Sequence, residues 1–86
     1  MRLLLTDRFR RAYRSLSPQD RKRVQKALLL MSEDLGYPGL RVKRLQGTAG
    51  IWEARASRSP RITFEVEGED LTLRNVGHHD DALRKP

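Results

Sequence analysis

The stretch from Arg61 to Val76, RITFEVEGEDLTLRNV, decides the fold. In its first half Ile62, Phe64 and Val66 alternate with polar residues, a pattern typical of a strand with one buried face. The next residues, EGED, predict a hairpin loop, and LTLRNV predicts the last strand. The sequence therefore predicts antiparallel strands that bury one apolar face.

Two amphipathic helices are predicted before these strands. Apolar residues recur at the spacing of one helical face in two groups: Phe9, Ala12, Tyr13 and Leu16, and then Val24, Ala27, Leu28, Met31 and Leu35. Thr6 or Asp7 is the expected cap of the first helix, and Ser17 caps the second with Pro18 at its first position. Gly36 is expected just past the end of the second helix. The two helices should form an antiparallel hairpin with basic residues on its outer face.

The remaining segments complete the predicted sheet. MRLLLTDRF predicts an opening strand, LRVKRL (40–45) predicts a short strand or an extended arm, and IWEARAS (51–57) predicts another strand. The fold class expected is α+β: one domain over residues 1–86, with an N-terminal strand and a two-helix antiparallel hairpin packed on a small, mostly antiparallel, twisted sheet of about four strands. The apolar run of residues 3–5 is too short for a signal peptide or a membrane span, so we expect a soluble, cytoplasmic protein without a membrane partner.

The chain is strongly basic. It contains 18 Lys and Arg against 11 Asp and Glu, which gives a formal net charge of +7. The basic residues lie in three clusters, which are the range 8–26, where Asp20 is the one acidic residue, the range 41–44, and the set Arg55, Arg58 and Arg61. This distribution favours a polyanionic partner, either nucleic acid or an acidic protein, over a merely solvated surface. The absence of cysteine excludes disulfides, thiolate nucleophiles and thiolate metal sites.

Strand alternation brings several functional side chains together. Glu53 and Arg55 share one face of their strand, and a pairing that buries the other face aims both of them, with Arg61, at the open side of the sheet. His78 and His79 follow the last strand and would lie near the rim of this surface. An ordinary solvated strand face and polar loop histidines are the alternatives that this reasoning leaves open.

A carboxylate, guanidiniums and an imidazole in one place suit cleavage of an RNA phosphodiester without a metal. Guanidiniums hold the phosphate and offset the charge that develops on its oxygens. A base takes the 2′-hydroxyl proton and an acid protonates the departing 5′-oxygen, and histidine suits either role near neutral pH. The run HHDD (78–81) has adjacent side chains that cannot easily converge on one ion, so no metal and no cofactor is expected.

The chain resembles the RelE/ParE superfamily of type II toxin–antitoxin toxins over essentially its whole length. Besides the basic helical hairpin, four short motifs carry the resemblance: KRLQG (43–47), WEAR (52–55), RITF (61–64) and VGHHD (76–80). The resemblance implies a small toxin that binds ribosomes, cuts mRNA, and is held silent by an acidic antitoxin in a hetero-oligomer. The positions that match the catalytic residues of the family's ribonucleases are Glu53, Arg55, Arg61 and His79.

The resemblance also implies contacts with RNA outside the catalytic set. The residues expected to make them are Arg41, Lys43, Arg44, Arg58, Arg74 and His78. Asp80 and Asp81 either raise the pKa of a histidine or cap a last helical turn. Two departures are visible: lysine-rich members of the family have lysines where Glu53 and Arg55 stand here, and the tail ALRKP lacks the aromatic residue that many members place near the C-terminus.

Two other functions stay open at this point. The ParE branch of the same superfamily binds DNA gyrase and lacks the ribonuclease chemistry, so that His79 would have no proton-transfer role. A relative that has lost toxicity would only bind its antitoxin. A histidine at the end of the last strand favours the ribonuclease, because general acid–base catalysis needs a group that titrates near neutral pH.

Overall fold

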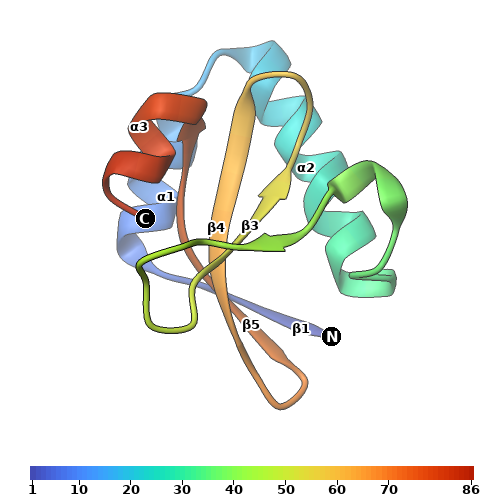
Figure 1. The fold of residues 1–86 in the computed structure, drawn as a ribbon. Coiled ribbons are helices and arrows are strands. Elements are labelled where there is room, and N and C mark those ends of the chain that lie inside the picture. Colours follow the sequence, from blue (N-terminus) through green and yellow to red (C-terminus); the bar gives the residue numbers. More distant parts are fainter.

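The molecule is a five-stranded sheet with two helices on one face and a short third helix on the other (Figure 1). The computed structural model describes the backbone of residues 1–86 and the side chains of residues 1–78 and 82–86. The elements are, in order, β1 (Arg2–Leu5), α1 (Asp7–Arg14), α2 (Pro18–Glu33), the 3-10 helix η1 (Pro38–Leu40), β2 (Lys43–Arg44), β3 (Trp52–Arg55), β4 (Pro60–Glu67), β5 (Asp70–His78) and α3 (His79–Arg84). The α+β fold class expected from the sequence is confirmed.

The strands lie in the order β1-β5-β4-β3-β2. β1 pairs in parallel with β5, and the other neighbours are antiparallel. The sheet has five strands where about four were expected, because the opening strand joins its edge. The segment 40–45 contributes only two strand residues, since Arg41 has a left-handed backbone (φ 46°) that a strand does not accommodate.

Both long helices begin at the side-chain caps that the sequence predicts. The hydroxyl of Thr6 accepts a hydrogen bond from the backbone N–H of Phe9 at 3.1 Å. The hydroxyl of Ser17 accepts one from the N–H of Asp20, also at 3.1 Å, and Pro18 occupies the first helical position. Each cap satisfies an N–H group that has no partner within its own helix.

Loss of the Ser17 cap is expected to weaken the fold measurably. Ser17→Ala leaves the N–H of Asp20 without its protein acceptor, so the free energy of unfolding should fall by about 1 kcal/mol. Urea unfolding followed by circular dichroism measures this change. Ser32→Ala is the matched control, because Ser32 lies inside α2 and alanine has the higher helix propensity there. Equal losses in the two variants would contradict the capping role.

The end of α2 differs from the prediction. The helix ends at Glu33, with Asp34 as its C-cap in an extended conformation (φ −156°), whereas the sequence predicts a helix that ends just before Gly36. The carboxylate of Asp34 accepts a hydrogen bond from the N–H of Gly36 at 3.0 Å. This local turn competes with continuation of the helix, which is a common effect of aspartate. Leu35 therefore packs half-buried beyond the helix.

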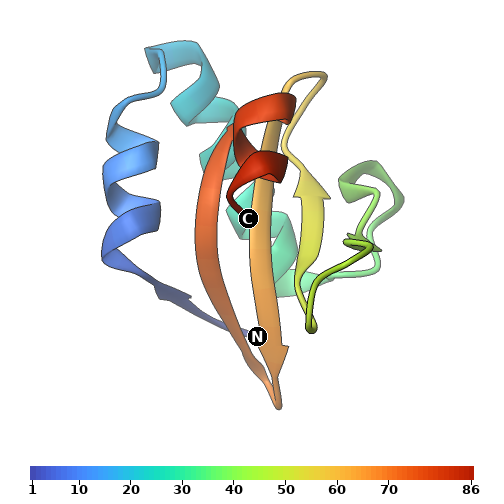
Figure 2. The same ribbon diagram turned by 60° about the vertical axis from the view of Figure 1, so that its left-hand side comes forward.

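The core lies between the two long helices and one face of the sheet. Its fully buried large side chains include Phe9 and Met31 from the helices and Ile62, Phe64 and Leu73 from the strands. In Figure 2, α2 (teal) passes behind the strands and α3 (red) crosses in front of β4 and β5. The helical stripes expected from the sequence thus fill one side of the sheet, and the other side is left to polar residues and the C-terminal segment.

A β-bulge interrupts the pairing of β4 with β5. Phe64 lies opposite Leu73 and Thr63 opposite Asn75, so β5 has one residue more than β4 at this point, which is Arg74. Such an extra residue shifts the alternation of the side chains that follow it. Asn75 is thereby turned to the face that carries Thr63, away from the long helices.

A two-point ion pair fixes the start of the sheet. Arg2 Nε and Nη2 donate to the two carboxylate oxygens of Asp70 at 3.0 and 2.9 Å. These hydrogen bonds from Arg2, and then its charge, lower the pKa of Asp70 below its ordinary value. Burial acts in the opposite direction on this exposed pair.

The Asp70 carboxylate should make stability depend on pH in acid. Because its pKa is lower in the folded state, its contribution is present above the ordinary value of 3.8 and is lost as the pH falls through the folded value. The stability difference between the wild type and Asp70→Asn should therefore shrink on acidification from pH 5 to pH 3 (roughly the span around a free aspartate). Urea unfolding at several pH values measures it. A difference that stays constant over this range would contradict the assignment.

Candidate functional site

The face of the sheet opposite α1 and α2 gathers the polar residues of the central strands. Glu53 pairs with Thr63, and Arg55 pairs with Arg61. Residues directly opposite each other on antiparallel strands point to the same side. Because Ile62 and Phe64 face the long helices, Glu53, Arg55 and Arg61 share the other face. We call these three residues the sheet-face cluster.

Glu53 is a buried carboxylate with incomplete hydrogen bonding. Its side chain lies on β3 and the residue is 4% exposed. One oxygen, Oε1, lies 3.5 Å from Nζ of Lys43 on the neighbouring edge strand. The other oxygen, Oε2, is buried and has no hydrogen-bond partner within the described part of the chain. Leaving a buried charged acceptor unpaired costs about 1–3 kcal/mol or more, so this oxygen is a strong candidate for a functional atom.

Arg61 holds the connection between β3 and β4. Its Nη1 donates to the backbone oxygens of Ser57, Arg58 and Ser59 at 3.1, 3.0 and 3.1 Å. The residue is 5% exposed, and its Nε is buried without a partner among the described residues. The guanidinium thus fixes the shape of the turn and keeps part of its donor capacity free. Sequence alternation alone gave no sign of this structural role.

Electrostatics link the members of the sheet-face cluster. Burial lowers the pKa of the Arg61 guanidinium below its usual value, the charge of Arg55 lowers it further, and the carboxylate of Glu53 opposes both. The guanidinium stays cationic at neutral pH, because arginine is not deprotonated in proteins. The cluster therefore holds two positive charges and one negative charge, with Glu53 and Arg61 buried and Arg55 half-buried. Charges of the buried pair act more strongly than in solvent.

The C-terminal segment covers part of this face. α3 packs over β4 and β5, and Ala82 is fully buried there. Beyond the helix, the Thr63 hydroxyl donates to the main-chain oxygen of Pro86 at 3.0 Å. The sequence led us to expect an open, solvent-filled surface, but Glu53 and Arg61 are nearly inaccessible. The residues after β5 fold back over β4 and β5, which strand alternation cannot reveal.

His78 does not join the cluster. It pairs with Pro60, so it lies one position beyond Gly77, the partner of Arg61. Its side chain reaches toward α2 instead: Nε2 lies 3.6 Å from the Asp20 carboxylate, and Nδ1 contacts the Ser59 hydroxyl. His79, the predicted catalytic histidine, has its side chain outside the described residues, and so do Asp80 and Asp81, the expected modulators or caps.

The residues expected to contact RNA form a basic edge beside the cluster. Arg41, Lys43 and Arg44 are exposed along η1 and β2, and Arg58 is exposed in the turn before β4. The guanidinium carbon of Arg44 lies 5.7 Å from the ring centroid of Trp52, a cation–π distance. These four exposed side chains can meet a polyanion at the rim of the sheet, and His78, also of the expected set, is exposed at the end of β5.

Arg74 is placed differently from the other expected RNA contacts. It is half-buried on β5, with Nη1 3.3 Å from the carboxylate of Glu65. Its Nε donates to the main-chain oxygen of Pro86 at 3.1 Å. The structure therefore puts Arg74 under the C-terminal segment rather than on the basic edge.

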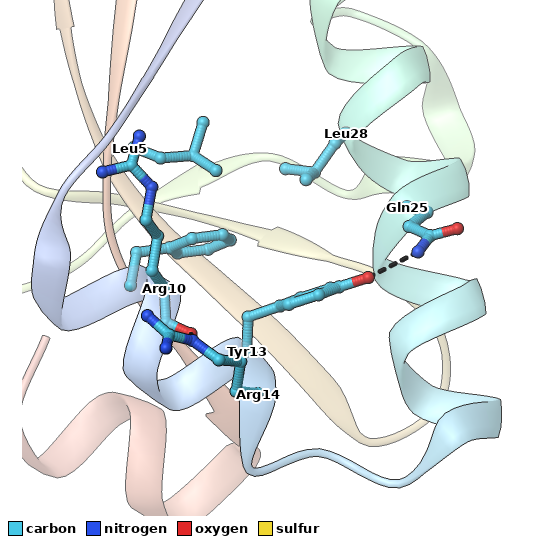
Figure 3. A pocket seen from close by; sticks show the side chains of 7 residues that line it. Leu5, Arg10, Tyr13, Arg14, Gln25 and Leu28 are labelled. Atoms are coloured by element: carbon cyan, nitrogen blue, oxygen red, sulfur yellow. Dashed lines mark hydrogen bonds between the residues drawn. The ribbon is translucent and has the colours of Figure 1, made fainter.

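A second hollow lies on the helical side of the molecule. It measures about 300 Å³ and opens between α1 and α2 (Figure 3). Leu5, Phe9, Tyr13 and Leu28 give it apolar walls, and Gln25 Nε2 donates to the Tyr13 hydroxyl across it at 2.5 Å. Basic side chains of α1 stand at its border, namely Arg10 and Arg14. This groove is a docking candidate on the far side of the sheet from the cluster.

The described residues form neither a cluster of metal ligands nor a helix that could span a membrane. Among the residues whose side chains are described, no three His, Cys, Asp or Glu come together in a way that could hold a metal ion. The HHDD run considered as a metal motif falls mostly outside those residues. Within the described chain, no helix combines the length and apolar character needed to cross a membrane.

Comparison of sequences finds no relatives, whereas comparison of structures does. No protein-family model and no curated protein matches this chain. The RelB–RelE antitoxin–toxin complex from Methanococcus jannaschii is similar over 91% of this chain and 92% of that chain, with 22% identity and a TM-score of 0.76. YafQ from E. coli strain BL21(DE3) is similar over 94% and 97%, with 13% identity and a TM-score of 0.76.

A third solved structure has a similar fold. The YoeB/ParE toxin from Agrobacterium tumefaciens is similar over 92% of this chain and 99% of that chain, with 18% identity and a TM-score of 0.75. At such identities the likeness establishes the fold, and the chemistry has to be argued from the residues present here.

Proposed function

From the RelE/ParE toxin fold that this chain has, we propose that it is the toxin of a type II toxin–antitoxin system and acts as an mRNA endoribonuclease. The observation that carries the enzymatic part is the sheet-face cluster: a buried carboxylate oxygen of Glu53 without a partner among the described residues, on the same face of the sheet as Arg55 and Arg61. A chain that only bound a protein partner would have no reason to keep an unpaired charge buried at this cost.

The proposed reaction needs no metal and no cofactor. Glu53 Oε2 accepts the proton of the ribose 2′-hydroxyl, because a carboxylate oxygen can serve as a general base. The 2′-oxygen then forms a bond to the adjacent phosphorus, the bond from phosphorus to the 5′-oxygen breaks, and a 2′,3′-cyclic phosphate results. Arg55 and the free donors of Arg61 offset the charge that develops on the phosphate oxygens.

The departing 5′-oxygen takes a proton from a general acid. We propose His79 for this role, because it directly follows β5 and an imidazole exchanges protons near neutral pH. His78 is less suited, since its ring contacts Asp20 and Ser59 on the other side of the strand. In this proposal Glu53 is the general base and His79 is the general acid.

The ribosome is the proposed setting for cleavage. The basic edge of Arg41, Lys43, Arg44 and Arg58 offers phosphate contacts, but the ring of Trp52, which could stack on a base, is already covered by Arg44. Free RNA would therefore be held loosely. A ribosome that presents mRNA in a fixed path would supply the positioning that this surface does not.

The proposed partner that silences the toxin is an acidic antitoxin, in a hetero-oligomer. Two structural neighbours were crystallised as antitoxin–toxin complexes, the RelB–RelE complex from Methanococcus jannaschii and the intact E. coli RelBE complex. The net charge of +7 favours an acidic partner. The groove between α1 and α2 fits apolar side chains of such a partner, with Arg10 and Arg14 placed for its carboxylates (Figure 3).

One experiment separates the ribonuclease from the alternatives. The chain is expressed in bacteria, mRNA ends are mapped by primer extension, and the supercoiling of a plasmid is scored in the same cells. Cuts within codons that disappear in Glu53→Gln and His79→Ala are the expected result. Inhibited supercoiling without cuts would replace the proposal with DNA gyrase binding, and the absence of both effects would leave a chain that only binds an antitoxin.

A further inference from the structure

Four side chains converge on two main-chain oxygens of the C-terminal segment. Thr63 Oγ1 and Arg74 Nε both donate to the oxygen of Pro86, at 3.0 and 3.1 Å. Asn75 Nδ2 donates to the oxygen of Lys85 at 2.9 Å, and Arg8 Nη2 donates to that same oxygen. The four donors come from α1, β4 and β5. We call Arg8, Thr63, Arg74 and Asn75 the donor cradle.

We propose that the donor cradle binds a backbone phosphate of single-stranded RNA, and that the oxygens of Lys85 and Pro86 occupy this site when no RNA is bound. For the identity of its ligand the inference rests on the proposed function. Each tail oxygen accepts two side-chain donors, which is the pattern that the two non-bridging oxygens of a phosphodiester would meet. A phosphate contacted in this way gains charge-assisted hydrogen bonds, which are stronger than those to a neutral carbonyl.

The charges of the cradle favour an anion over the peptide oxygen of Lys85. Arg8 forms no ion pair within the described part of the chain, and Arg74 has Glu65 at 3.3 Å as its counter-charge. The Arg8 guanidinium therefore faces a peptide oxygen that carries only a partial charge. A hollow of about 140 Å³ lined by Thr6, Arg8 and Arg74 lies beside the cradle and gives a ligand a way in.

The cradle also lies in the right place for a substrate of the sheet-face cluster. Lys43, Glu53, Thr63 and Asn75 form one row of paired residues across the sheet. A phosphate on Thr63 and Asn75 would thus lie one strand away from Glu53. We infer that the cradle holds a phosphate next to the scissile one and that RNA binding displaces the tail from the sheet.

The test uses the full chain and an RNA that cannot be cut, a 2′-O-methyl hexanucleotide. Its affinity is measured by fluorescence anisotropy for the wild type, Arg74→Gln, and Lys22→Gln, an exposed position on α2 that loses the same charge. Arg74→Gln should bind about tenfold more weakly than Lys22→Gln, because it loses a charge-assisted contact. Equal affinities in these two variants would overturn the cradle.

The tail gives a second, independent readout. Saturating hexanucleotide should shift the amide NMR signals of residues 83–85, and unmoved signals at saturation would overturn the proposed displacement. Ala82→Gln, which crowds a buried position, should loosen the tail and raise the affinity several-fold, because competition for the cradle is relieved. Circular dichroism checks that each variant is folded, and an Ala82→Gln protein that is folded but binds no more tightly also counts against the proposal.

These outcomes are separate from those of the proposed function. The hexanucleotide has no free 2′-hydroxyl, so its binding does not depend on catalysis. If it binds through the cradle while cellular mRNA stays intact, only the ribonuclease proposal fails. If mRNA is cut but Arg74→Gln and Lys22→Gln bind the hexanucleotide with equal affinity, only the proposal that the donor cradle binds a phosphate fails.

Discussion

Glu53→Gln is expected to lower the rate of RNA cleavage by a factor of about 10² to 10⁴, the usual contribution of a general base. Glutamine has the size of glutamate, and its amide oxygen can still accept a hydrogen bond from Lys43, which now lies 3.5 Å from the carboxylate. The substitution removes the charge and the proton-accepting oxygen alone. Cleavage of a defined mRNA in a purified translation system measures the rate.

Stability distinguishes a catalytic Glu53 from a structural one. Because Oε2 is buried without a partner, removal of its charge should leave the free energy of unfolding unchanged or raise it. Glu67→Gln is the matched control: Glu67 is exposed near the end of β4 and should affect neither property. A Glu53→Gln protein that is clearly less stable, with cleavage reduced only in proportion to its folded fraction, would show that Glu53 serves the fold.

Phe64→Ala should have the largest effect on stability, with a loss of about 3–5 kcal/mol in the free energy of unfolding. Phe64 is fully buried in the middle of β4 and belongs to the cluster that joins both helices to the sheet. Truncation of its ring removes apolar contacts and leaves a cavity that the surrounding residues fill only in part. For a chain of 86 residues, such a loss is a large share of the total stability.

Urea unfolding followed by the fluorescence of Trp52 measures this loss. Val66→Ala is the control on the same strand, because Val66 is 41% exposed and its truncation should cost less than about 1 kcal/mol. Similar losses in the two variants would mean that the interior is not packed around Phe64 as described.

The elements of the fold could be predicted from local signals. Ser17 and Pro18 mark the start of α2, and the alternation of Ile62, Phe64 and Val66 marks β4, although Val66, near the end of the strand, is 41% exposed. The end of α2 could not be predicted as well, because Asp34 and Gly36 both stop a helix and the side-chain hydrogen bond of Asp34 acts first. The extent of β2 depended on the backbone of one residue, Arg41.

The candidate site was predictable only in part. Alternation with period 2 suffices to put Glu53, Arg55 and Arg61 on one side, because it needs only the strands and their pairing. Strand alternation does not predict which segments pack on that face of the sheet. The contacts of Arg61 depend on the turn before β4, and those of Thr63 depend on the tail, both of which are irregular or long-range features.

Because Arg74 is an extra residue in β5, it can be removed from the chain without changing which residues of β4 and β5 lie opposite each other. Deletion of Arg74 would leave Leu73 opposite Phe64 and Asn75 opposite Thr63, so the ladder would become regular and the interior would keep its residues. A homologous chain that is shorter by this one position could therefore share the whole architecture while lacking one of the two cationic donors beneath its tail. In an alignment of related sequences, a single-residue gap at position 74 would mark the chains that hold their ligand in another way.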